Sequence, residues 1–395
     1  MSNALDAYNP TFYAQNALTQ LELALGMTRR VYMGYDEERK SVEEGDTIEV
    51  RVPSSFVVQD GGNGTVQDTK TDKIQMKLDQ WKEVKFGMTD KELALSHNKI
   101  IEEHIRPAIL PLAVFVENYL TNLYRAVPYS YNMASSFDVT DITGARKVVR
   151  DNAGAVIDDV IMSCAVDSTL EAAMLSSTIF HSAGVTGENR NQNALIKGHL
   201  GQRFGTEFFV QQTLPTHTGG TVLTGADQAG TLTGAHAKGA TAIAIADLAG
   251  VETLKAGDSF YFATAPTVRY AVTGDVTLTA GAAAGVGIFP ALKADVADTT
   301  VITFEADGAS NHCASFATNL MFHKNAFAVA FGRLPKIGHG AGARMSVVQD
   351  PVTGLAIRSR IAYIDGSAKV VITFDILFGG KCIRPELACV MRRNV

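Results

Sequence analysis

The chain has 395 residues, of which 46% are hydrophobic and 19% charged, and its formal net charge is −6. At this length we expect two or more domains, because a single core seldom supports so many residues. The acidic balance argues against general nucleic-acid binding, which needs clustered Lys and Arg to displace counterions. We find neither an apolar run long enough for a membrane span nor the pattern of a secretory signal, and therefore expect synthesis in the cytoplasm.

The first predicted element is a helix near the N-terminus. Apolar side chains recur at helical spacing at Phe12, Ala17, Leu18, Leu21 and Leu25, and Gly26 ends the pattern. The residues that follow, up to 42, offer little that could close a local core. We therefore expect an N-terminal arm that needs a neighbouring chain to pack on.

Residues 45–90 predict a long β-hairpin. Apolar side chains alternate with polar ones at Ile48, Val50 and Val52, and again on a return strand at Ile74, Met76 and Leu78, followed by Trp81, Val84 and Phe86. A Gly-rich segment from Asp60 to Thr65 lies between the strands and suits a turn. Because two strands alone are marginal in water, the hairpin also requires support from elsewhere.

A long helical region follows the hairpin. Thr89 and Glu92 have the spacing of a capping box, and an apolar stripe continues from Ile101 to Leu123. Pro107 and Pro111 interrupt it, so we expect either a kink or a short helix followed by a longer one that starts near Pro107.

The rest of the chain outside residues 216–308 reads as mixed α and β structure. The pattern predicts helices at 140–151 and 167–180, a strand at 201–212 and a helical or mixed segment at 314–329. Strands are predicted at 347–349, 355–364 and 369–378, with a hairpin turn around Asp365 and Gly366, and a final short strand lies in the tail.

Residues 216–308 differ in composition from both flanks. They contain no Cys, Met, Trp or Asn, they are rich in Gly, Ala and Thr, and they carry four Lys/Arg against nine Asp/Glu, or −5 of the total −6. Short β-prone runs recur through the segment. These features predict an all-β domain with its own core, inserted into the larger chain.

The sequence offers little that resembles a catalytic, nucleotide-binding or metal-binding motif. The loose nucleotide-binding pattern at 338–343 does not lie between a strand and a helix, so we read it as a loop. His97 and His104 lack a completing carboxylate for a metal site, and His217 is expected to serve a turn at the edge of the insert. We predict that the protein is not an enzyme and holds no cofactor, metal or catalytic residue.

The cysteines also give no sign of a site. Cys164, Cys313, Cys382 and Cys389 lie in apolar contexts without C-x-x-C spacing. We expect buried, reduced thiols rather than disulfides or metal ligands.

Several stretches, taken in chain order, resemble the major capsid proteins of tailed phages with the Hong Kong 97-type fold, in particular the podovirus branch whose coat protein carries an inserted β-barrel domain. After the arm, these stretches are LDQWKEVKFGMTDKELAL (78–95), GQRFGTEFFVQQTLPTHTGG (201–220), NLMFHKNAFAVA (319–330), FDILFGG (374–380) and RPELA (384–388). The resemblance spans nearly the whole chain, and it rests on the order of the stretches and the placement of the insert.

The resemblance implies an α+β fold divided into five regions. These are an N-terminal arm (1–44), an extended hairpin loop (45–90), a peripheral domain with a long spine helix (91–130 and 341–395), an axial domain (131–215 and 309–340) and an inserted β domain (216–308). Contacts between subunits are expected at Phe12, Leu18, Leu21, Val50, Phe56, Asp60, Trp81 and Phe86. Trp81 and Phe86 are the largest apolar groups on a hairpin without a covering layer of its own.

The implied function is that of a major capsid protein. Its copies form the pentamers and hexamers of an icosahedral shell, assembled with scaffolding and portal proteins and filled with double-stranded DNA that is bound without sequence specificity. The location is the virion, with no membrane partner. Two alternatives stay open: an encapsulin-type shell protein, which shares the fold, and a structural tail protein whose insert binds carbohydrate.

Overall fold

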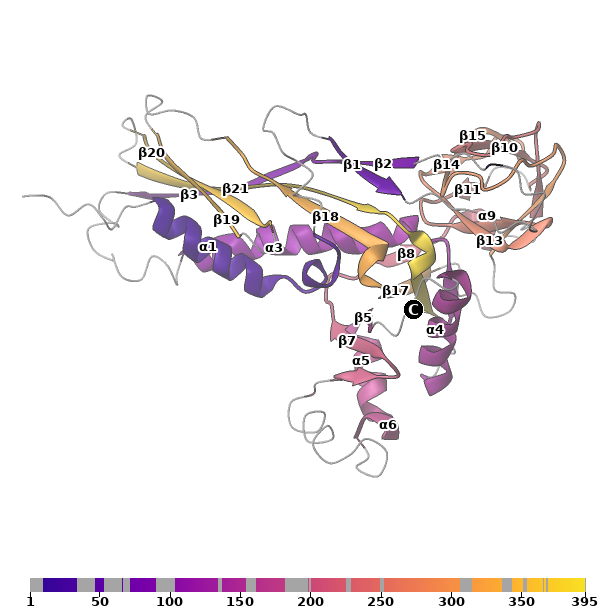
Figure 1. The fold of residues 1–395 in the computed structure, drawn as a ribbon, viewed down its shortest axis with the longest axis horizontal. Coiled ribbons are helices and arrows are strands. Elements are labelled where there is room, and N and C mark those ends of the chain that lie inside the picture. Colours follow the sequence, from indigo (N-terminus) through magenta and orange to yellow (C-terminus); the bar gives the residue numbers. More distant parts are fainter. Residues whose placement is uncertain are drawn as a thin grey trace, which may run out of the picture. The chain divides into compact units, whose positions relative to one another are not determined.

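The computed structural model describes residues 10–33, 47–52, 66, 72–89, 104–133, 137–153, 161–181, 198, 200–224, 229–248, 252–305, 315–335, 343–350, 354–364, 366 and 369–394. The chain, drawn in Figure 1, divides into two units. Each unit is made of three segments, which alternate along the sequence with those of the other unit. Unit 1 comprises Met1–Leu25, Tyr32–Val116 and Ala328–Ile383, and unit 2 comprises Gly26–Val31, Glu117–Phe327 and Arg384–Val395.

Unit 1 is built on a five-stranded sheet. Its strands are β18 (Phe327–Gly332, in unit 1 from Ala328), β21 (Lys369–Cys382), β20 (Ala356–Ile364) and β19 (Ala343–Gln349) in that order, with β3 (Gln80–Thr89) also pairing β21. The predicted hairpin around residues 365–366 is confirmed by the antiparallel pairing of β20 with β21. The register of β3 with β21 is unbroken from Thr89↔Lys369 to Gln80↔Phe378.

The predicted N-terminal helix is confirmed as α1 (Pro10–Ala24). Its buried side chains are Tyr13, Ala14, Ala17 and Leu21, and the helix packs on β19 and β20 of its own chain. The expectation that this segment needs a neighbouring chain is therefore wrong for α1. Ala14 and Ala17 give the helix a small-residue face that fits closely against the sheet, which supplies the core that the local sequence lacks.

The region predicted to be helical after the hairpin forms α3 from Arg106 to Thr121 and continues as a 3₁₀ turn, Asn122–Ala126. The prediction of a helix starting near Pro107 is confirmed, since a proline is well tolerated in the first turn. The proposed capping box lies partly outside the described residues, and Thr89 itself ends strand β3. The ring of Phe115 on α3 lies 6.1 Å from that of Phe378 on β21, so α3 covers the same sheet.

The predicted hairpin is present but shorter than expected. Strands β1 (Thr47–Val52) and β2 (Asp72–Lys77) pair antiparallel, with Ile48 opposite Met76. These two side chains and Leu78 are buried with residues of β18 and with Ile383, so the hairpin has apolar cover within its own chain. Trp81 and Phe86 do not belong to the hairpin, because after Asp79 the chain joins the five-stranded sheet as β3.

Unit 2 contains a seven-stranded sheet. Its order is β4 (Ser130–Asn132), β22 (Ala388–Asn394), β17 (Ser315–Phe322), β5 (Met162–Val166), β7 (Thr206–Val210) and β6 (Gln202–Arg203), and β8 (Thr216–Thr218) also pairs β17. The helices are α4 (Val139–Ala153), α5 (Ser168–Ser176) and α6 (Thr178–His181), which confirm both helical predictions for this region. Short 3₁₀ turns lie at Thr28–Arg30, Lys324–Ala326 and Pro385–Leu387.

Two expectations for this sheet are wrong. Residues 314–329, expected to be helical or mixed, form β17, a 3₁₀ turn and the start of β18. Because β17 is buried on both faces, its sequence lacks the apolar–polar alternation that would have distinguished it from a helix. The tail strand β22, grouped by the resemblance with 341–395, instead pairs β17 and β4 in unit 2.

The inserted segment forms a closed barrel, as the all-β prediction requires. Its strands in barrel order are β10 (Ala242–Ala246), β15 (Ala283–Phe289), β13 (Ala265–Val272), β12 (Ser259–Phe262), β16 (Val301–Phe304) and β9 (Ala229–Leu232), with a separate pair, β11 (Thr253–Leu254) and β14 (Val276–Thr277), and a short helix α9 (Thr221–Thr224). Aromatic rings of Phe260, Phe262, Tyr270 and Phe304 fill its core. Because β8 belongs to the host sheet, the barrel begins only after Thr218.

Among the described residues, Cys164, Cys382 and Cys389 are free and buried, as expected, while Cys313 lies outside them. Burial raises the pKa of the Cys164 and Cys389 thiols far above the usual value. No helix in the described part of the chain is long and apolar enough to cross a membrane.

Candidate functional site

The predicted contact residues of the arm do not share one environment. Phe12 is exposed on α1, Leu18 is half-buried, and Leu21 is buried against the chain's own sheet. Leu21 is therefore not available to a partner, and its assignment as a subunit contact is corrected. Phe56 and Asp60 lie outside the described residues.

The contact residues of the predicted loop fall on two elements. Val50 lies in β1 opposite Ile74. Trp81 and Phe86 lie on β3 and, being five residues apart, face opposite sides of the strand. Trp81 is 56% exposed, whereas the ring of Phe86 packs 6.2 Å from that of Phe374 inside unit 1. Phe86 thus has a packing partner within its own unit while staying only half-buried, and the burial of both rings against a neighbour stays a prediction.

Trp81 lies beside a group of compensated charges. The guanidinium of Arg358 is 6.0 Å from the centre of the indole ring and donates from Nε to Asp375 Oδ2 at 2.9 Å. Arg360 also donates to Asp375, at 3.0 Å, and pairs with Glu83 at 2.5 Å. The charges beside the indole are therefore engaged in ion pairs with one another. Trp is among the residue types most enriched at the positions that dominate binding in protein interfaces.

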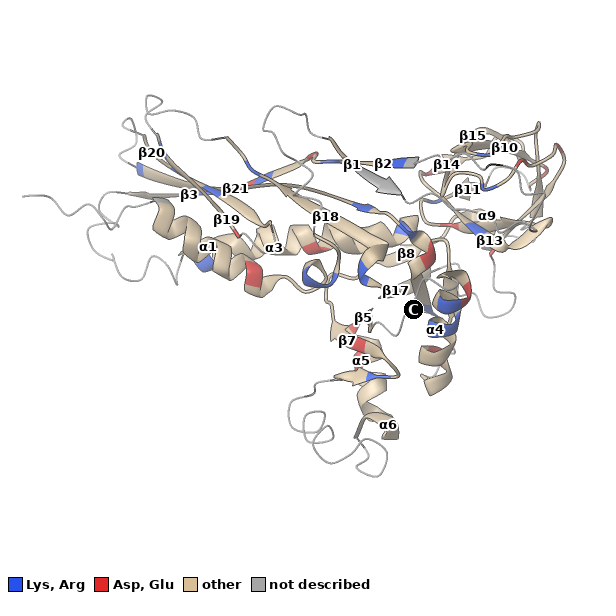
Figure 2. Ribbon diagram, viewed as in Figure 1, with Lys and Arg blue, Asp and Glu red and all other residues tan. Residues whose placement is uncertain are grey.

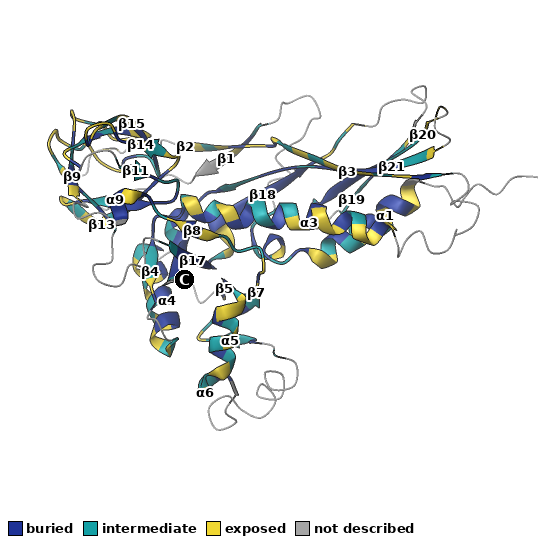
Figure 3. Ribbon diagram, turned by 180° about the vertical axis from the view of Figure 1, so that it is seen from behind, coloured by how far each residue is buried: buried dark blue, intermediate teal, exposed yellow. Residues whose placement is uncertain are grey.

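The outward sides of α1 and α3, which we call the helix-layer face, expose apolar side chains. Phe12 and Leu23 on α1, and Leu110 and Val114 on α3, are between 47% and 66% exposed. Figure 3 shows exposed positions along both helices. Each helix thus exposes two large apolar side chains, and exposed apolar patches are a mark of interaction surfaces.

Charge is nearly absent from these helices. The only charged residue of α1 is Glu22, and those of α3 are Arg106 and the buried Glu117. Both ribbons are therefore mostly tan, the colour of uncharged residues, in Figure 2. Of the helix-layer face, the sequence reasoning identified Phe12 and missed Leu23, Leu110 and Val114. The signal that could have found them is that α3 is apolar nearly all the way round, as in helices covered on more than one side.

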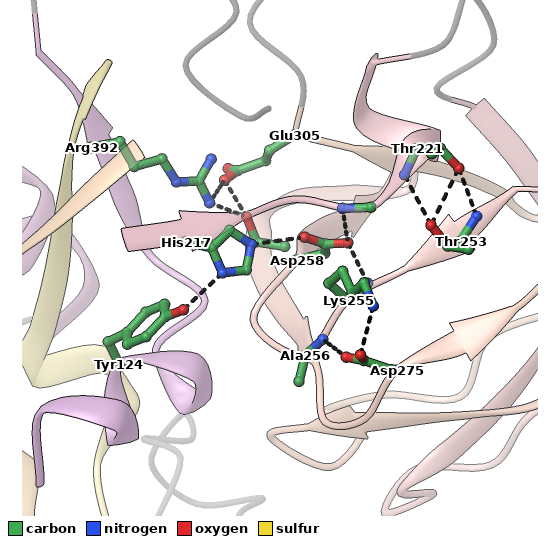
Figure 4. A network of polar contacts seen from close by, with 12 residues as sticks. Tyr124, His217, Thr221, Thr253, Lys255, Ala256, Asp258, Asp275, Glu305 and Arg392 are labelled. Atoms are coloured by element: carbon green, nitrogen blue, oxygen red, sulfur yellow. Dashed lines mark hydrogen bonds and ion pairs between the residues drawn. The ribbon is translucent and has the colours of Figure 1, made fainter. Parts of the chain in front are cut away.

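A buried polar network joins the barrel to the seven-stranded sheet of unit 2 (Figure 4). At its centre is His217 of β8, which was expected to serve a turn but is buried within a strand. Its Nδ1 lies 2.8 Å from the Tyr124 hydroxyl and its Nε2 lies 3.0 Å from Asp258 Oδ1. The other Asp258 oxygen accepts hydrogen bonds from the backbone N–H groups of Gly220 (3.1 Å) and Lys255 (2.7 Å).

Glu305, which follows barrel strand β16, makes the second half of this network. It accepts hydrogen bonds from the hydroxyls of Ser130 (2.9 Å) and Ser259 (2.5 Å). It pairs with Arg269 at 2.5 Å and with Arg392 at 3.3 Å. Since Ser130 lies in β4 and Arg392 in β22, this one carboxylate connects the barrel to two strands of the host sheet.

The network has the chemistry of a structural connection between the barrel and the sheet, which we call a joint, and not that of a catalytic site. A His–Asp pair is also the core of many hydrolytic sites, but here both ring nitrogens are occupied and the ring is buried, so His217 has no face for a substrate. Burial raises the pKa of the Tyr124 hydroxyl, which therefore stays protonated and able to donate. Within the described ranges no cluster of His, Cys, Asp and Glu could hold a metal ion.

Comparison with known proteins finds no family model that matches the chain and no matching curated protein. Among solved structures, the chain is similar to one from Mycobacterium phage Che8 (12% identity, 93% of this chain and 90% of that chain, TM-score 0.48). It is also similar to the capsid of cyanophage P-SCSP1u (10%, 90% and 85%, 0.43) and to a virus-like particle from Pyrococcus furiosus (9%, 96% and 98%, 0.40). The chain is thus similar, over most of its length, to chains of phage and virus-like particle structures.

Proposed function

We propose that this protein is the major capsid protein of a tailed phage, of the Hong Kong 97-type fold with a barrel inserted as in the podovirus branch. The observation that carries the proposal is the helix-layer face: two helices of unit 1 present a nearly uncharged surface with Phe12, Leu23, Leu110 and Val114 exposed. In a shell such faces are buried by neighbouring subunits, and apolar burial of this kind drives assembly.

The way the barrel is inserted supports the same reading. Its entry strand β8 and its exit strand β17 are paired, with Thr218 opposite Ser315, so the chain leaves and re-enters the host sheet at one point. A domain added at such a point leaves the host sheet intact. We propose the five regions with the boundaries given above, with three exceptions. The barrel begins after Thr218, β22 groups with the axial region, and β18 groups with the peripheral region.

The proposed assembly is an icosahedral shell of pentamers and hexamers, formed with scaffolding and portal proteins and enclosing double-stranded DNA. The net charge of −6 supports non-specific enclosure, because a motor-filled shell does not need to neutralise phosphate and a strongly basic lining would hold the DNA at the wall. The proposed location is the virion.

Sedimentation of the purified protein, followed by analysis of the particle contents, tests the proposal. A major capsid protein is expected to form large uniform particles, and co-expression with scaffolding and packaging genes from the same genome is expected to fill them with DNA. Particles that instead retain a co-expressed enzyme and take up no DNA support the encapsulin-type alternative. A protein that stays monomeric under all conditions contradicts both.

A further inference from the structure

A buried carboxylate holds the segment that follows α1. Glu117 Oε1 accepts hydrogen bonds from the backbone N–H groups of Gly26 (3.0 Å) and Thr28 (3.1 Å), and Oε2 accepts from that of Met27 (2.8 Å). The Thr28 hydroxyl and the Gln211 side-chain amide donate to the same carboxylate at 2.7 and 3.0 Å. All of these groups belong to unit 2.

This contact completes a helix end that has no cap of its own. The 3₁₀ turn Thr28–Arg30 begins after Met27, which makes no side-chain capping hydrogen bond. Glu117, about ninety residues away in sequence, takes the place of the cap. An ionised carboxylate is well suited to this position, because the N–H groups at a helix start carry partial positive charge.

The far end of the segment is fixed independently. The Arg30 guanidinium donates to the Gly26 carbonyl at 3.0 Å, pairs with Glu207 at 2.6 Å and lies 4.2 Å from the centre of the Phe209 ring. Gly26 also packs closely, because a Cβ placed there would lie 2.6 Å from the side-chain oxygen of Gln211, which would have to move. The segment Gly26–Arg30 is therefore held in place by contacts at both of its ends.

The Glu117 contact lies where the chain passes from unit 1 to unit 2 along the sequence. Residues up to Leu25 group with unit 1, and Gly26–Val31 group with unit 2, so Glu117 binds the chain immediately after it leaves unit 1. We propose that Glu117 is the anchor that fixes the Gly26–Thr28 segment of the N-terminal arm in the unassembled chain, and that particle formation depends on this anchor. The role of Glu117 in fixing the segment does not depend on the proposed function, whereas its role in particle formation rests on it.

Hydrogen exchange of the unassembled chain tests the anchor directly, with the variant Glu117→Gln. The amide keeps the shape but has no charge, and it turns one N–H₂ group toward backbone donors. We expect the amides of Gly26, Met27 and Thr28 to exchange at least about tenfold faster, the scale of losing a hydrogen bond to a charged group. The control Glu171→Gln on α5 leaves these rates unchanged. Wild-type rates in Glu117→Gln overturn the anchor.

If Glu117→Gln does not fold, Gly26→Ala tests the same contact from the other side, because its Cβ would force the Gln211 side chain, whose amide donates to Glu117, to move. Faster exchange at Met27 and Thr28 supports the anchor, and unchanged exchange overturns it. Particle yield is then compared at equal soluble protein. A severalfold lower yield for the variants supports the role of Glu117 in particle formation, and a wild-type yield overturns it. If the wild-type chain itself forms no particles, the proposed function is contradicted. The hydrogen-exchange rates of Gly26, Met27 and Thr28 then still test whether Glu117 fixes this segment.

Discussion

Single side chains determine how firmly the barrel is held on the sheet of unit 2. His217 and Asp258 are both buried, and each satisfies the other together with Tyr124. The connection is polar rather than apolar, so its strength depends on every partner being present. A buried group that loses its hydrogen-bond partner is destabilised by about 1–3 kcal/mol.

The variant His217→Ala is therefore expected to weaken the junction by about 1–3 kcal/mol, since it leaves Asp258 Oδ1 without its partner. Hydrogen exchange at the paired amides of β8 and β17 measures this as lost protection. The control Lys147→Ala removes only an exposed pair with Asp151 and is expected to change stability by less than about 0.5 kcal/mol. Equal protection in wild type and His217→Ala contradicts the assignment of this network as a joint.

The two large rings of β3 provide a matched pair, because one faces outward and the other inward. Trp81→Ala is expected to leave the unassembled chain folded, since the indole is 56% exposed, and to reduce particle formation. Phe86→Ala is expected to destabilise unit 1 itself, but by less than the roughly 3–5 kcal/mol found for a fully buried Phe, because this ring is only half-buried. Thermal unfolding and particle yield, measured on both variants, separate the two effects. A Trp81→Ala chain that unfolds early, or that assembles at the wild-type yield, contradicts the anchor role of Trp81.

At the scale of elements, α1 and α3 each have a sheet-facing side and an outward apolar side. The outward side carries the proposed function, so a change there should affect assembly more than folding. The double variant Leu110→Lys/Val114→Lys keeps good helix formers but places two charges on the helix-layer face. We expect an unchanged circular-dichroism spectrum and a large loss of particles. Thr143→Lys on the exposed side of α4 is the control, and equal particle yields for both variants speak against the helix-layer face as a contact.

Elements with strong local signals could be predicted from the sequence, and contacts between distant residues could not. The spacing of α1 and α4 and the turn at residues 365–366 led to the correct helices and hairpin. Strand β17 was missed because both of its faces are buried, which erases the alternation. Leu21 was assigned to a neighbour because an amphipathic helix looks the same whether it packs on its own sheet or on another chain.

The junction shows the same limit. His217 was read as a turn residue because Tyr124 and Asp258 lie 93 and 41 positions away along the chain. No local pattern connects residues at such separations. The chemistry of the site therefore becomes visible only once β8 is seen to pair with β17.

At the scale of the whole molecule, the inserted barrel has a core of its own and a polar connection to its host. The fragment 216–308 is expected to fold when produced alone, with a β-type circular-dichroism spectrum. It should melt at a lower temperature than the barrel in the full chain, because Glu305 loses Arg392 and Ser130, and His217 loses Tyr124. A disordered spectrum contradicts the independent core.

Image reconstruction of the purified, assembled protein by electron cryomicroscopy tests the central claim most directly. The account predicts closed icosahedral particles built of pentamers and hexamers, with Trp81 and the helix-layer face of α1 and α3 covered in the assembly and the barrel held on the sheet of unit 2 through His217 and Glu305. A protein that forms only monomers or small open oligomers, or particles in which Phe12, Leu110 and Val114 stay exposed to solvent, contradicts it.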